Sequence, residues 1–394
     1  MPGIPEAKFR TIRRIIYGNY INEWSNCKLP RMTVAFEIIF GFCFLIAGAE
    51  LLVRGSTRLA LAVGISPLVV GLTVVAFGTS APEFAVSMKA SLAGQADIAL
   101  GNAVGSNIFN VLLILGISAL IAPLSISRQL VRLDVPVMIV VSMLLWVLSA
   151  DGNLSRIEGL LFVAGIVFYT ALLIFLGRRS ADNVEQQTDL PKQSGPERRY
   201  NRLTILLLIL GGLGALVLGA RLLVTGSVSL ARLLGVGELV IGLTIIAAGT
   251  SLPEVATSVV ASVRGQRDIA VGNVVGSNIF NILCVLGAAA AASKTGIAVT
   301  TSALKFDIPV MTAAAVVCLP VFFTGSRISR GEGVIFLVYY AAYIIYLIWT
   351  AKTPVEMENF RQILWWYVIP LTAIVLIISV ILSFRNGRGK TTIT

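Results

Sequence analysis

Apolar stretches of about 20 residues recur along almost the whole chain, separated by short polar segments. A helix of that length crosses the hydrocarbon core of a bilayer. The chain is 56% hydrophobic and 13% charged, which is more apolar surface than a soluble core of 394 residues can hide from water. We therefore predict an all-α integral membrane protein. The expected spans are 34–62, 67–92, 98–121, 132–150, 157–177, 203–234, 238–263, 269–292, 304–324 and 333–350, with an eleventh at 363–384.

A sequence repeat relates the two halves of this apolar region. Residues 71–116 align without a gap with residues 242–287, and about 30 of the 46 aligned positions are identical. The similarity continues upstream at the same offset and downstream at a slightly larger one, so each repeat is a unit of five helices. Because five is odd, the second unit enters the membrane in the opposite orientation, which gives two inverted-topology repeats and ten transmembrane helices. Such inversion is typical of transporters.

The basic residues divide the chain further. We expect a basic tail at 1–31, a first repeat at 32–177, a linker at 178–202, a second repeat at 203–351, and an extra helix with a basic tail at 352–394. The positive-inside rule places the linker in the cytoplasm. It places the following loop residues on the same side: Arg128, Arg132, Arg264, Arg267, Arg327 and Arg330.

The N-terminal tail contradicts this orientation, because its basic residues fall on the outer side when five crossings are counted back from the linker. One hypothesis is that translation starts at Met32. The composition also excludes several classes. The chain has no histidine, and its four cysteines have no CxxC spacing, which disfavours a zinc site, a disulfide framework and a conventional catalytic triad. The net charge of +11 lies mostly in short loops, so we expect no nucleic-acid partner.

Two repeated motifs interrupt apolar spans. GTSAPE at 78–83 and GTSLPE at 249–254 each place a glycine, two hydroxyls, a proline and a carboxylate in the middle of a helix. Each proline clashes with the carbonyl four residues earlier, so the helix should bend or unwind there. Irregular backbone and acids at bilayer depth indicate a functional site. We therefore expect Glu83 and Glu254 to meet at a binding site near the middle of the membrane.

The second repeated motif, GNAVGSNIFN and its copy GNVVGSNIFN, adds further oxygen atoms. Ser106 and Asn110 are four residues apart and share one helix face, as do Ser277 and Asn281. Carboxylate, hydroxyl and carbonyl oxygens suit hard cations such as Ca²⁺ and Na⁺, whereas transition metals favour imidazole or thiolate. Competition of the two ions for the same pair of glutamates makes their binding mutually exclusive, which exchange requires.

The polar residues of both motifs and the other acids can also have purely structural roles. The hydroxyls of both GTS segments could bond back to their own helices, and the serines and asparagines could join helices as polar contacts. The other intramembrane acids lie near helix starts, where capping or the helix dipole is the expected role: Asp97, Asp134, Asp268 and Asp307.

At these motifs the sequence resembles the sodium/calcium exchanger family of the cation/calcium antiporter superfamily, in its compact prokaryotic type. The resemblance covers roughly residues 35–350. It implies a secondary active antiporter, not an enzyme, that exchanges three Na⁺ for one Ca²⁺ by alternating access and needs no cofactor. Some K⁺-dependent relatives have Asp where this chain has Asn281, so it also implies independence from K⁺. The implied ligands are the side chains of Glu83, Glu254, Thr79, Ser80, Thr250, Ser251, Ser106, Asn110, Ser277 and Asn281, and the backbone carbonyls of Ala76 and Ala247.

In such relatives the long first and sixth helices slide across the other eight. One hypothesis is that Gly48, Gly55, Gly219 and Gly226 form a smooth surface for that movement. We expect a monomer in the plasma (cell inner) membrane, with inorganic cations and lipid as its partners. The nearest alternative is a Ca²⁺/H⁺ or other divalent cation/H⁺ antiporter, because a buried glutamate can carry the proton itself. A channel predicts a symmetric pore, usually of several subunits, which the internal inversion disfavours.

Overall fold

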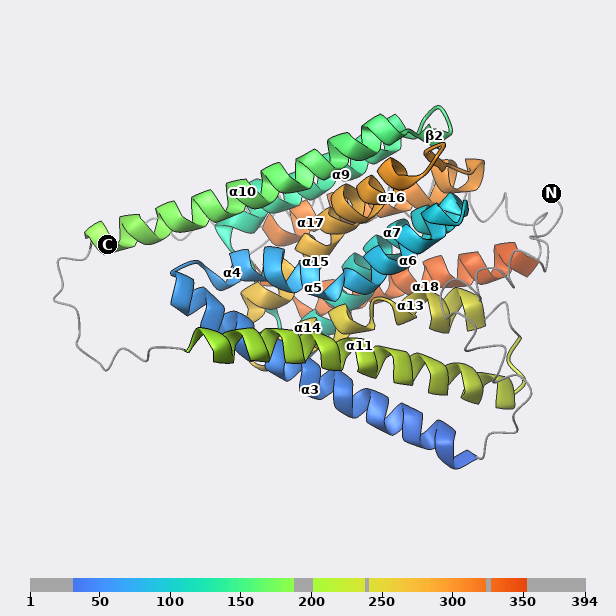
Figure 1. Ribbon diagram of the computed structural model, residues 1–394, viewed down its shortest axis with the longest axis horizontal. Coiled ribbons are helices and arrows are strands. Elements are labelled where there is room, and N and C mark those ends of the chain that lie inside the picture. The colour runs from blue at the N-terminus through green and yellow to red at the C-terminus, as the bar shows by residue number, and fades with distance from the viewer. Residues whose placement is uncertain (1–30, 188–200, 238–240, 324–326, 353–394) are drawn as a thin grey trace.

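The computed structural model describes residues 31–187, 201–237, 241–323 and 327–352, and almost all of them are helical (Figure 1). The elements of the first half are α3 (Arg31–Val63), α4 (Pro67–Val70), η1 (Gly71–Val75), α5 (Ala76–Thr79), α6 (Ala81–Leu92), α7 (Ala96–Phe109), η2 (Asn110–Ile114), α8 (Leu115–Ile121), β1 (Leu124–Ser125), η3 (Leu130–Asp134), α9 (Val135–Leu148), β2 (Asn153–Leu154) and α10 (Arg156–Gln187). Those of the second half are α11 (Arg202–Leu233), η4 (Gly242–Ile246), α13 (Ala247–Gly249), α14 (Leu252–Val263), α15 (Arg267–Phe280), η5 (Asn281–Leu286), α16 (Gly287–Ala292), β3 (Ile297–Ala298), η6 (Ala303–Asp307), α17 (Ile308–Phe323), β4 (Arg327–Ile328) and α18 (Arg330–Lys352).

Within the described residues, eight helices are long and apolar enough to cross a membrane. The bent pair Pro67–Thr79 and Ala81–Leu92, which meet at 47°, brings the number to nine if the pair is one span. The segment predicted as the seventh span contains a shorter apolar helix, Leu252–Val263. The predicted eleventh helix at 363–384 and the tail up to residue 30 lie outside the described residues.

The long first and sixth spans are confirmed, because α3 has 33 residues and α11 has 32. The fifth span is longer than predicted, since α10 also has 32 residues and ends at Gln187 instead of residue 177. Residues 178–187 contain neither proline nor glycine, so nothing in this stretch stops the helix where its apolar part ends. The start of the predicted linker is therefore helical.

Six short π-helical segments interrupt the α-helices, and they fall into three pairs at repeat-matched positions. η1 and η4 precede the two GTS segments, η2 and η5 begin at Asn110 and Asn281, and η3 and η6 end at Asp134 and Asp307. A π-turn adds a residue to the helical turn and is frequent at functional sites. Both halves therefore carry irregular backbone at the same places.

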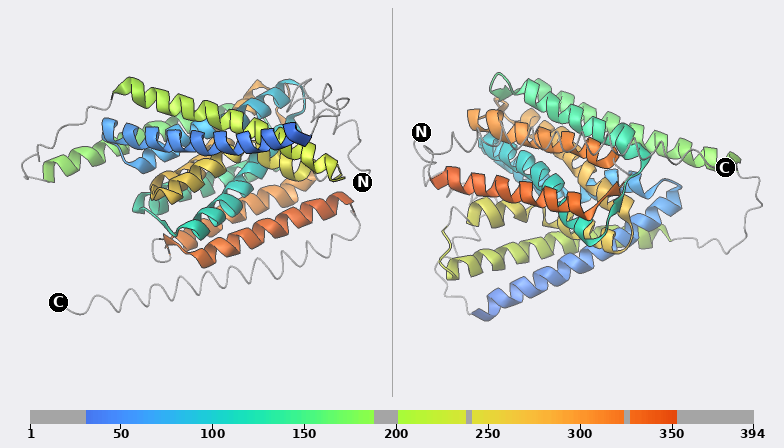
Figure 2. Two further views of the ribbon diagram at one scale, coloured as in Figure 1. Left: turned by 90° about the horizontal axis from the view of Figure 1, so that it is seen from below. Right: turned by 180° about the vertical axis from the view of Figure 1, so that it is seen from behind.

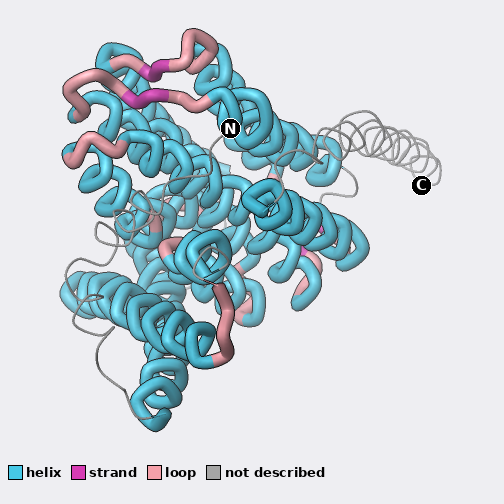
Figure 3. Tube along the Cα trace, turned by 90° about the vertical axis from the view of Figure 1, so that its right-hand side faces the viewer, coloured by secondary structure: helices cyan, strands magenta, loops and turns pink. Residues whose placement is uncertain are grey.

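Two antiparallel strand pairs join loops of the two halves, β1 with β4 and β2 with β3. Figure 3 shows these strands as short stretches within the loops. Arg267 Nη1 also donates a hydrogen bond to Ser125 Oγ, 3.1 Å away. Because Ser125 pairs with Arg327 in the β1–β4 ladder, Arg267 and Arg327 lie at the same end of the bundle, as the loop charges predict.

The two long helices α3 and α11 lie side by side along one edge of the bundle (Figures 1 and 2). A Cβ atom built on Gly48 would lie 2.7 Å from the backbone nitrogen of Leu216, and one built on Gly219 would lie 2.6 Å from that of Leu45. The glycines therefore let the two backbones touch. The helix pair shares four such glycines: Gly48, Gly55, Gly219 and Gly226. The hypothesis that they form the sliding surface is wrong, because they lie between α3 and α11 and fix these helices to each other.

Both long helices are followed by a glycine in the left-handed region. Gly64 follows α3 with a φ of 72°, and Gly235 follows α11 with a φ of 75°. Glycine is favoured at such helix ends because it has no Cβ atom to clash in this conformation. No described atom lies within 4 Å of a Cβ built on either residue. The two turns thus match each other at the repeat offset.

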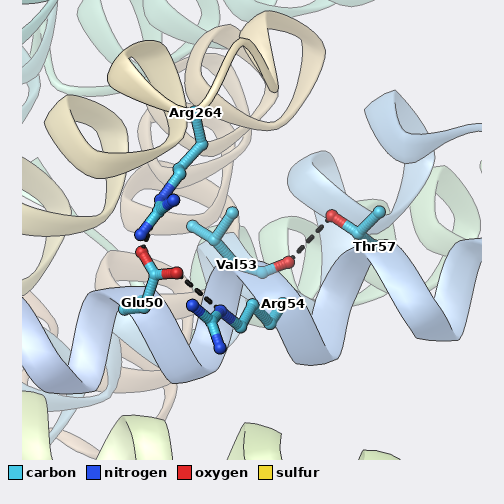
Figure 4. A network of polar contacts seen from close by, with 5 residues as sticks. All are labelled: Glu50, Val53, Arg54, Thr57 and Arg264. Carbon is cyan, nitrogen blue, oxygen red and sulfur yellow. Dashed lines mark hydrogen bonds and ion pairs between the residues drawn. The ribbon is translucent and has the colours of Figure 1, made fainter.

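One ion-pair network connects α3 to the end of α14 (Figure 4). Glu50 Oε1 accepts from Arg54 Nε at 2.5 Å, and Glu50 Oε2 accepts from Arg264 Nε at 2.9 Å. At the repeat offset of 171, the positions that match Glu50 and Arg264 hold Arg221 and Ala93. The second repeat therefore cannot form the same pair, and the network makes the two halves unequal.

The core of the bundle is built around α7 and α15. All residues of α15 from Ile269 to Phe280 are buried, including its polar ones. Apolar side chains of α7, α9 and α17 pack into the same cluster. A fully buried helix that carries serine and asparagine needs internal partners for them, and the asparagines of α7 and α15 find these partners in one another and in the two broken helices.

Candidate functional site

Both GTS segments end a helix and a new helix begins directly after them. Ser80 separates α5 from α6 with a ψ of 6°, and Ser251 precedes α14 with a ψ of 8°. Pro82 and Pro253 each lie in the first turn of the helix that follows, where a missing N–H group is tolerated. The predicted break of the helix at each proline motif is confirmed.

Glu83 and Glu254 are each fully buried, with 0% of the residue exposed. Ser251 Oγ donates to Glu83 Oε1 at 2.8 Å, and Ser80 Oγ donates to Glu254 Oε1 at 3.1 Å. Each acid is thus bonded to the serine of the other motif. The structure therefore brings the two predicted acids together at the centre of the bundle.

The threonines of the motifs also bond across the two halves. Thr79 Oγ1 lies 3.1 Å from Asn273 Oδ1, and Thr250 Oγ1 lies 3.4 Å from Asn102 Oδ1. Thr79 Oγ1 is also 3.4 Å from the carbonyl of Ala76 in its own helix. The bond of Thr79 back to its own helix is thus longer than its bond to Asn273 in the other half.

The serines and asparagines of the second motif make a further set of buried polar contacts. Ser106 Oγ lies 3.1 Å from Ser251 Oγ. Asn110 Nδ2 donates to Asn278 Oδ1 and Asn281 Nδ2 donates to Asn107 Oδ1, both at 3.1 Å. All of these side chains are buried. The polar cluster therefore extends along α7 and α15 beyond the acids.

Several buried oxygen atoms of this cluster have no hydrogen-bond partner among the described residues. They are Glu83 Oε2, Glu254 Oε2, Asn110 Oδ1, Asn281 Oδ1 and Ser277 Oγ. A buried polar atom left without a partner costs about 1–3 kcal/mol, and more if it is charged. A hard cation satisfies such oxygens. The cluster thus offers both the ligand chemistry and the unused coordination capacity for Ca²⁺ or Na⁺.

Four asparagines of this cluster were not predicted as site residues: Asn102, Asn107, Asn273 and Asn278. All four belong to the GNxxGSNIFN motif, so the repetition of that motif is the signal that could have found them. They donate or accept hydrogen bonds between helices and hold the predicted residues in place.

The remaining predicted residues lie around the cluster or apart from it. The carbonyl of Ala76 accepts from the Ser80 N–H at 3.0 Å, and Ala247 is the first residue of α13. Asp97 and Asp268 lie in the first turns of α7 and α15, as expected from the helix dipole.

Asp134 and Asp307 do not cap their helices. Asp134 Oδ1 accepts instead from the Tyr169 hydroxyl at 2.9 Å, and Asp307 Oδ1 from the Tyr343 hydroxyl at 3.2 Å. Each carboxyl group thus accepts from a tyrosine of another helix, Tyr169 of α10 or Tyr343 of α18. The predicted structural role thus stands, but through a different bond.

The donor set differs from that of a transition-metal centre. Within the described residues, no group of three or more histidine, cysteine, aspartate or glutamate residues gathers to hold a metal ion. Two carboxylates with hydroxyl and amide oxygens are instead the kind of donor set that hard cations prefer.

Known proteins are similar to this chain in sequence and in fold. The family described as sodium/calcium exchanger protein matches residues 34–175 and 204–349. The inner membrane protein YrbG of Escherichia coli is 36% identical over 326 residues, which are 81% of this chain and 98% of YrbG. The sodium/calcium exchanger MaX1 of Methanosarcina acetivorans is 34% identical over 348 residues, which are 80% and 99%.

A solved structure of the sodium-calcium exchanger NCX_Mj, soaked with zero Na⁺ and Ca²⁺, matches with a TM-score of 0.69 and 30% identity. The match covers 81% of this chain and 100% of that chain. The family match includes both copies of each repeated motif. The chain is therefore a multi-pass membrane transporter and not an enzyme, and it belongs to the sodium/calcium exchanger family of cation/Ca²⁺ antiporters, in its compact prokaryotic type.

Proposed function

We propose that this chain exchanges three Na⁺ for one Ca²⁺ by alternating access at the site between the two GTSxPE motifs, without K⁺. One reciprocal observation carries the proposal. Each of the two buried carboxylates has one oxygen bonded to a serine of the opposite motif and one oxygen without a partner in the described part of the chain. The serines orient the acids, and the unpartnered oxygens are left to bind an ion.

The proposed ligand set comprises the side chains of Glu83, Glu254, Thr79, Ser80, Thr250, Ser251, Ser106, Asn110, Ser277 and Asn281, with the backbone carbonyls of Ala76 and Ala247. Two ionised carboxylates balance the charge of one Ca²⁺. Na⁺ uses the same oxygens, so the two loaded states exclude each other, and exchange follows from that competition. No cofactor takes part.

Independence from K⁺ is supported by the amide at position 281. Asn281 donates to Asn107 and keeps its own Oδ1 free, so it contributes a neutral oxygen where an aspartate would add a third negative charge. A site with fewer charges holds fewer monovalent ions at once, which favours Na⁺ and Ca²⁺ alone.

The proposed architecture is two inverted five-helix repeats, 32–177 and 203–351, a cytoplasmic linker at 178–202, and an extra helix with a basic tail at 352–394. It is supported by the crossed pairing of the site, in which repeat-matched residues make matched bonds, such as Ser251 to Glu83 and Ser80 to Glu254. We assign the protein to the plasma (cell inner) membrane as a monomer whose partners are cations and lipid, with no nucleic acid.

Exchange of Ca²⁺ for H⁺ is the alternative. It is favoured by the complete burial of Glu83 and Glu254, because a buried carboxyl oxygen without a partner can also take up a proton. The two proposals differ in the gradient that drives uptake.

Sealed vesicles that contain the purified full chain discriminate between them. We expect Ca²⁺ uptake when the vesicles are loaded with Na⁺, and none when only a proton gradient is imposed. Replacing K⁺ by choline should leave uptake unchanged. An inside-positive potential should accelerate it, because three Na⁺ leave for each Ca²⁺ that enters. Uptake driven by protons alone would replace the Na⁺ proposal by its alternative.

A further inference from the structure

We propose that Asn102 and Asn273 are positioning residues that orient the hydroxyls of Thr250 and Thr79 for the cation, each acting across the two halves of the chain. This inference rests on the proposed function, because it concerns ligands of the same site. Neither asparagine belongs to the proposed ligand set. Both occupy the second position of the GNxxGSNIFN motif, in α7 and α15.

The amide groups of both asparagines are anchored in their own half. Asn273 Nδ2 donates to Ser258 Oγ at 3.0 Å and to the backbone carbonyl of Glu254 at 3.4 Å. Asn102 Nδ2 makes the matching bonds, to Ser87 Oγ at 2.9 Å and to the carbonyl of Glu83 at 3.2 Å. Because the NH₂ group has two donors in total, both are used, and the amide orientation is fixed.

With the NH₂ group anchored, the Oδ1 atom of each asparagine points at the threonine of the other half. Asn273 Oδ1 lies 3.1 Å from Thr79 Oγ1, and Asn102 Oδ1 lies 3.4 Å from Thr250 Oγ1. An amide oxygen can only accept, so the threonine hydroxyl must donate. Its hydrogen is then directed at the asparagine, and the lone pairs of its oxygen remain for a cation.

The same bond protects a second oxygen. The carbonyl of Ala76, at 3.4 Å, is a second acceptor near Thr79 Oγ1. Without Asn273 the hydroxyl hydrogen would be free to turn to that carbonyl, which is itself a proposed ligand. Asn273 therefore keeps two oxygens available, the hydroxyl of Thr79 and the carbonyl of Ala76.

Each asparagine also connects the backbone at an acid to the opposite half. Asn273 bonds to the Glu254 carbonyl and to Thr79, and Asn102 bonds to the Glu83 carbonyl and to Thr250. The position of one acid is thus coupled to that of the other half's hydroxyl. Groups that hold metal ligands in this way typically change metal affinity by about 10- to 100-fold when they are removed.

A double-mutant cycle on the full chain tests the inference. Thr79→Val, Asn273→Ala and the double variant are compared for the KM for Ca²⁺ and for maximal uptake in Na⁺-loaded vesicles. We expect Asn273→Ala to raise KM by about 10-fold or more. In the Thr79→Val background the same change should raise KM by a clearly smaller factor, because the target hydroxyl is gone and only the bonds to Ser258 and to the Glu254 carbonyl remain to be lost. A parallel cycle uses Thr250→Val and Asn102→Ala at the less buried asparagine.

Ser91→Ala is the matched control. Ser91 Oγ donates across the two halves to the carbonyl of Ala289, so the variant also loses a buried hydrogen bond between the halves, but outside the site. Its KM should equal that of the wild type. Stabilisation of the purified protein by Ca²⁺ against thermal unfolding gives a second reading of affinity that does not depend on transport.

The outcomes separate this inference from the proposed function. If the wild type does not exchange the ions, or if Thr79→Val leaves KM unchanged, the proposed site fails and the inference fails with it. If Thr79→Val weakens Ca²⁺ binding but Asn273→Ala does not, or if the two effects simply add in both cycles, the positioning role alone is overturned. Non-additive losses in either cycle support it.

Discussion

Ser251 and Glu83 lie on opposite halves of the chain, and the Ser251 hydroxyl donates to Glu83 Oε1 over 2.8 Å. Ser80 and Glu254 form the matching bond at 3.1 Å. The second oxygen of each carboxylate has no hydrogen-bond partner within the residues that the structure describes. Each half therefore orients the acid of the other half, so the site requires both halves in register.

Glutamine in place of either acid should reduce Na⁺-dependent Ca²⁺ uptake by about 100-fold. Glu83→Gln and Glu254→Gln keep the shape of the side chain and an acceptor for the serine, but they remove the charge. A contact with a charged group contributes up to about 3 kcal/mol, and losing that free energy corresponds to a reduction of about 100-fold. The measurement is the initial rate of ⁴⁵Ca²⁺ uptake into Na⁺-loaded vesicles.

The control for these variants is Glu158→Gln. Glu158 Oε2 accepts from the Ser155 N–H at 2.7 Å at the start of α10, a capping position that glutamine also fills. Its uptake should match the wild type. Normal uptake by Glu83→Gln or Glu254→Gln would be incompatible with a cation site at these acids.

Ser251→Ala should weaken Ca²⁺ binding more than Ser80→Ala. The Ser251 hydroxyl has the shorter bond to its acid and also contacts Ser106, whereas Ser80 makes the longer bond. A hydrogen bond to a charged group contributes about 1.5–3 kcal/mol, so we expect KM for Ca²⁺ to rise by about 10- to 100-fold. Equal KM values for Ser251→Ala and the wild type would show that the serine does not orient the acid.

Gly48→Ala should destabilise the protein by separating α3 from α11. The added Cβ would lie 2.7 Å from the backbone nitrogen of Leu216, which cannot move without shifting the helix. Overpacking of this kind costs about 1–3 kcal/mol. Thermal unfolding of the purified protein in detergent measures the effect as a lower Tm.

Gly214→Ala on α11 is the control, because no described atom lies within 4 Å of its Cβ. Alanine favours the helix over glycine by about 1 kcal/mol, so the Tm should stay the same or rise. If both substitutions lowered the Tm equally, close packing at Gly48 would not be the cause.

Loss of the ion pair between Glu50 and Arg264 should have a small effect that salt removes. The Arg264 side chain is 56% exposed, and Arg54 remains beside Glu50 when Arg264 is lost. Exposed pairs contribute at most about 1 kcal/mol. Arg264→Gln should therefore lower the Tm slightly at low ionic strength and not at high ionic strength. A large decrease that persists in salt would indicate a packing role for Arg264.

The acids and hydroxyls of the candidate site could be predicted from the sequence because they belong to short motifs that occur twice. Polar groups in apolar spans are conspicuous, as Glu83, Glu254 and the GTS hydroxyls are, and the prolines predict the break in each helix. The asparagines that connect the halves were harder to assign. Asn102 and Asn273 each lie in a helix whose sequence shows no break, and their threonine partners are far away in the chain.

The sequence also did not show which neighbouring helix each residue packs against. Gly48 and Gly219 were correctly recognised as small residues for close helix contact, but a glycine does not indicate which neighbour it faces. The length of α10 depended on residues beyond the membrane-length stretch, and the bond between Asp134 and Tyr169 depended on how two helices are rotated. These features follow from tertiary contacts.

The strand pairs fasten only part of the molecule. β1–β4 and β2–β3 bind loops between the inner helices by main-chain bonds, and within the described residues no strand reaches α3 or α11. The long helices instead continue into the bundle through turns at Gly64 and Gly235, whose surroundings are open. Mechanical compliance is therefore uneven along the chain. Under a load applied at the membrane surface, the inner helices joined by the strand pairs would stay stiff, and the turns at Gly64 and Gly235 would bend first.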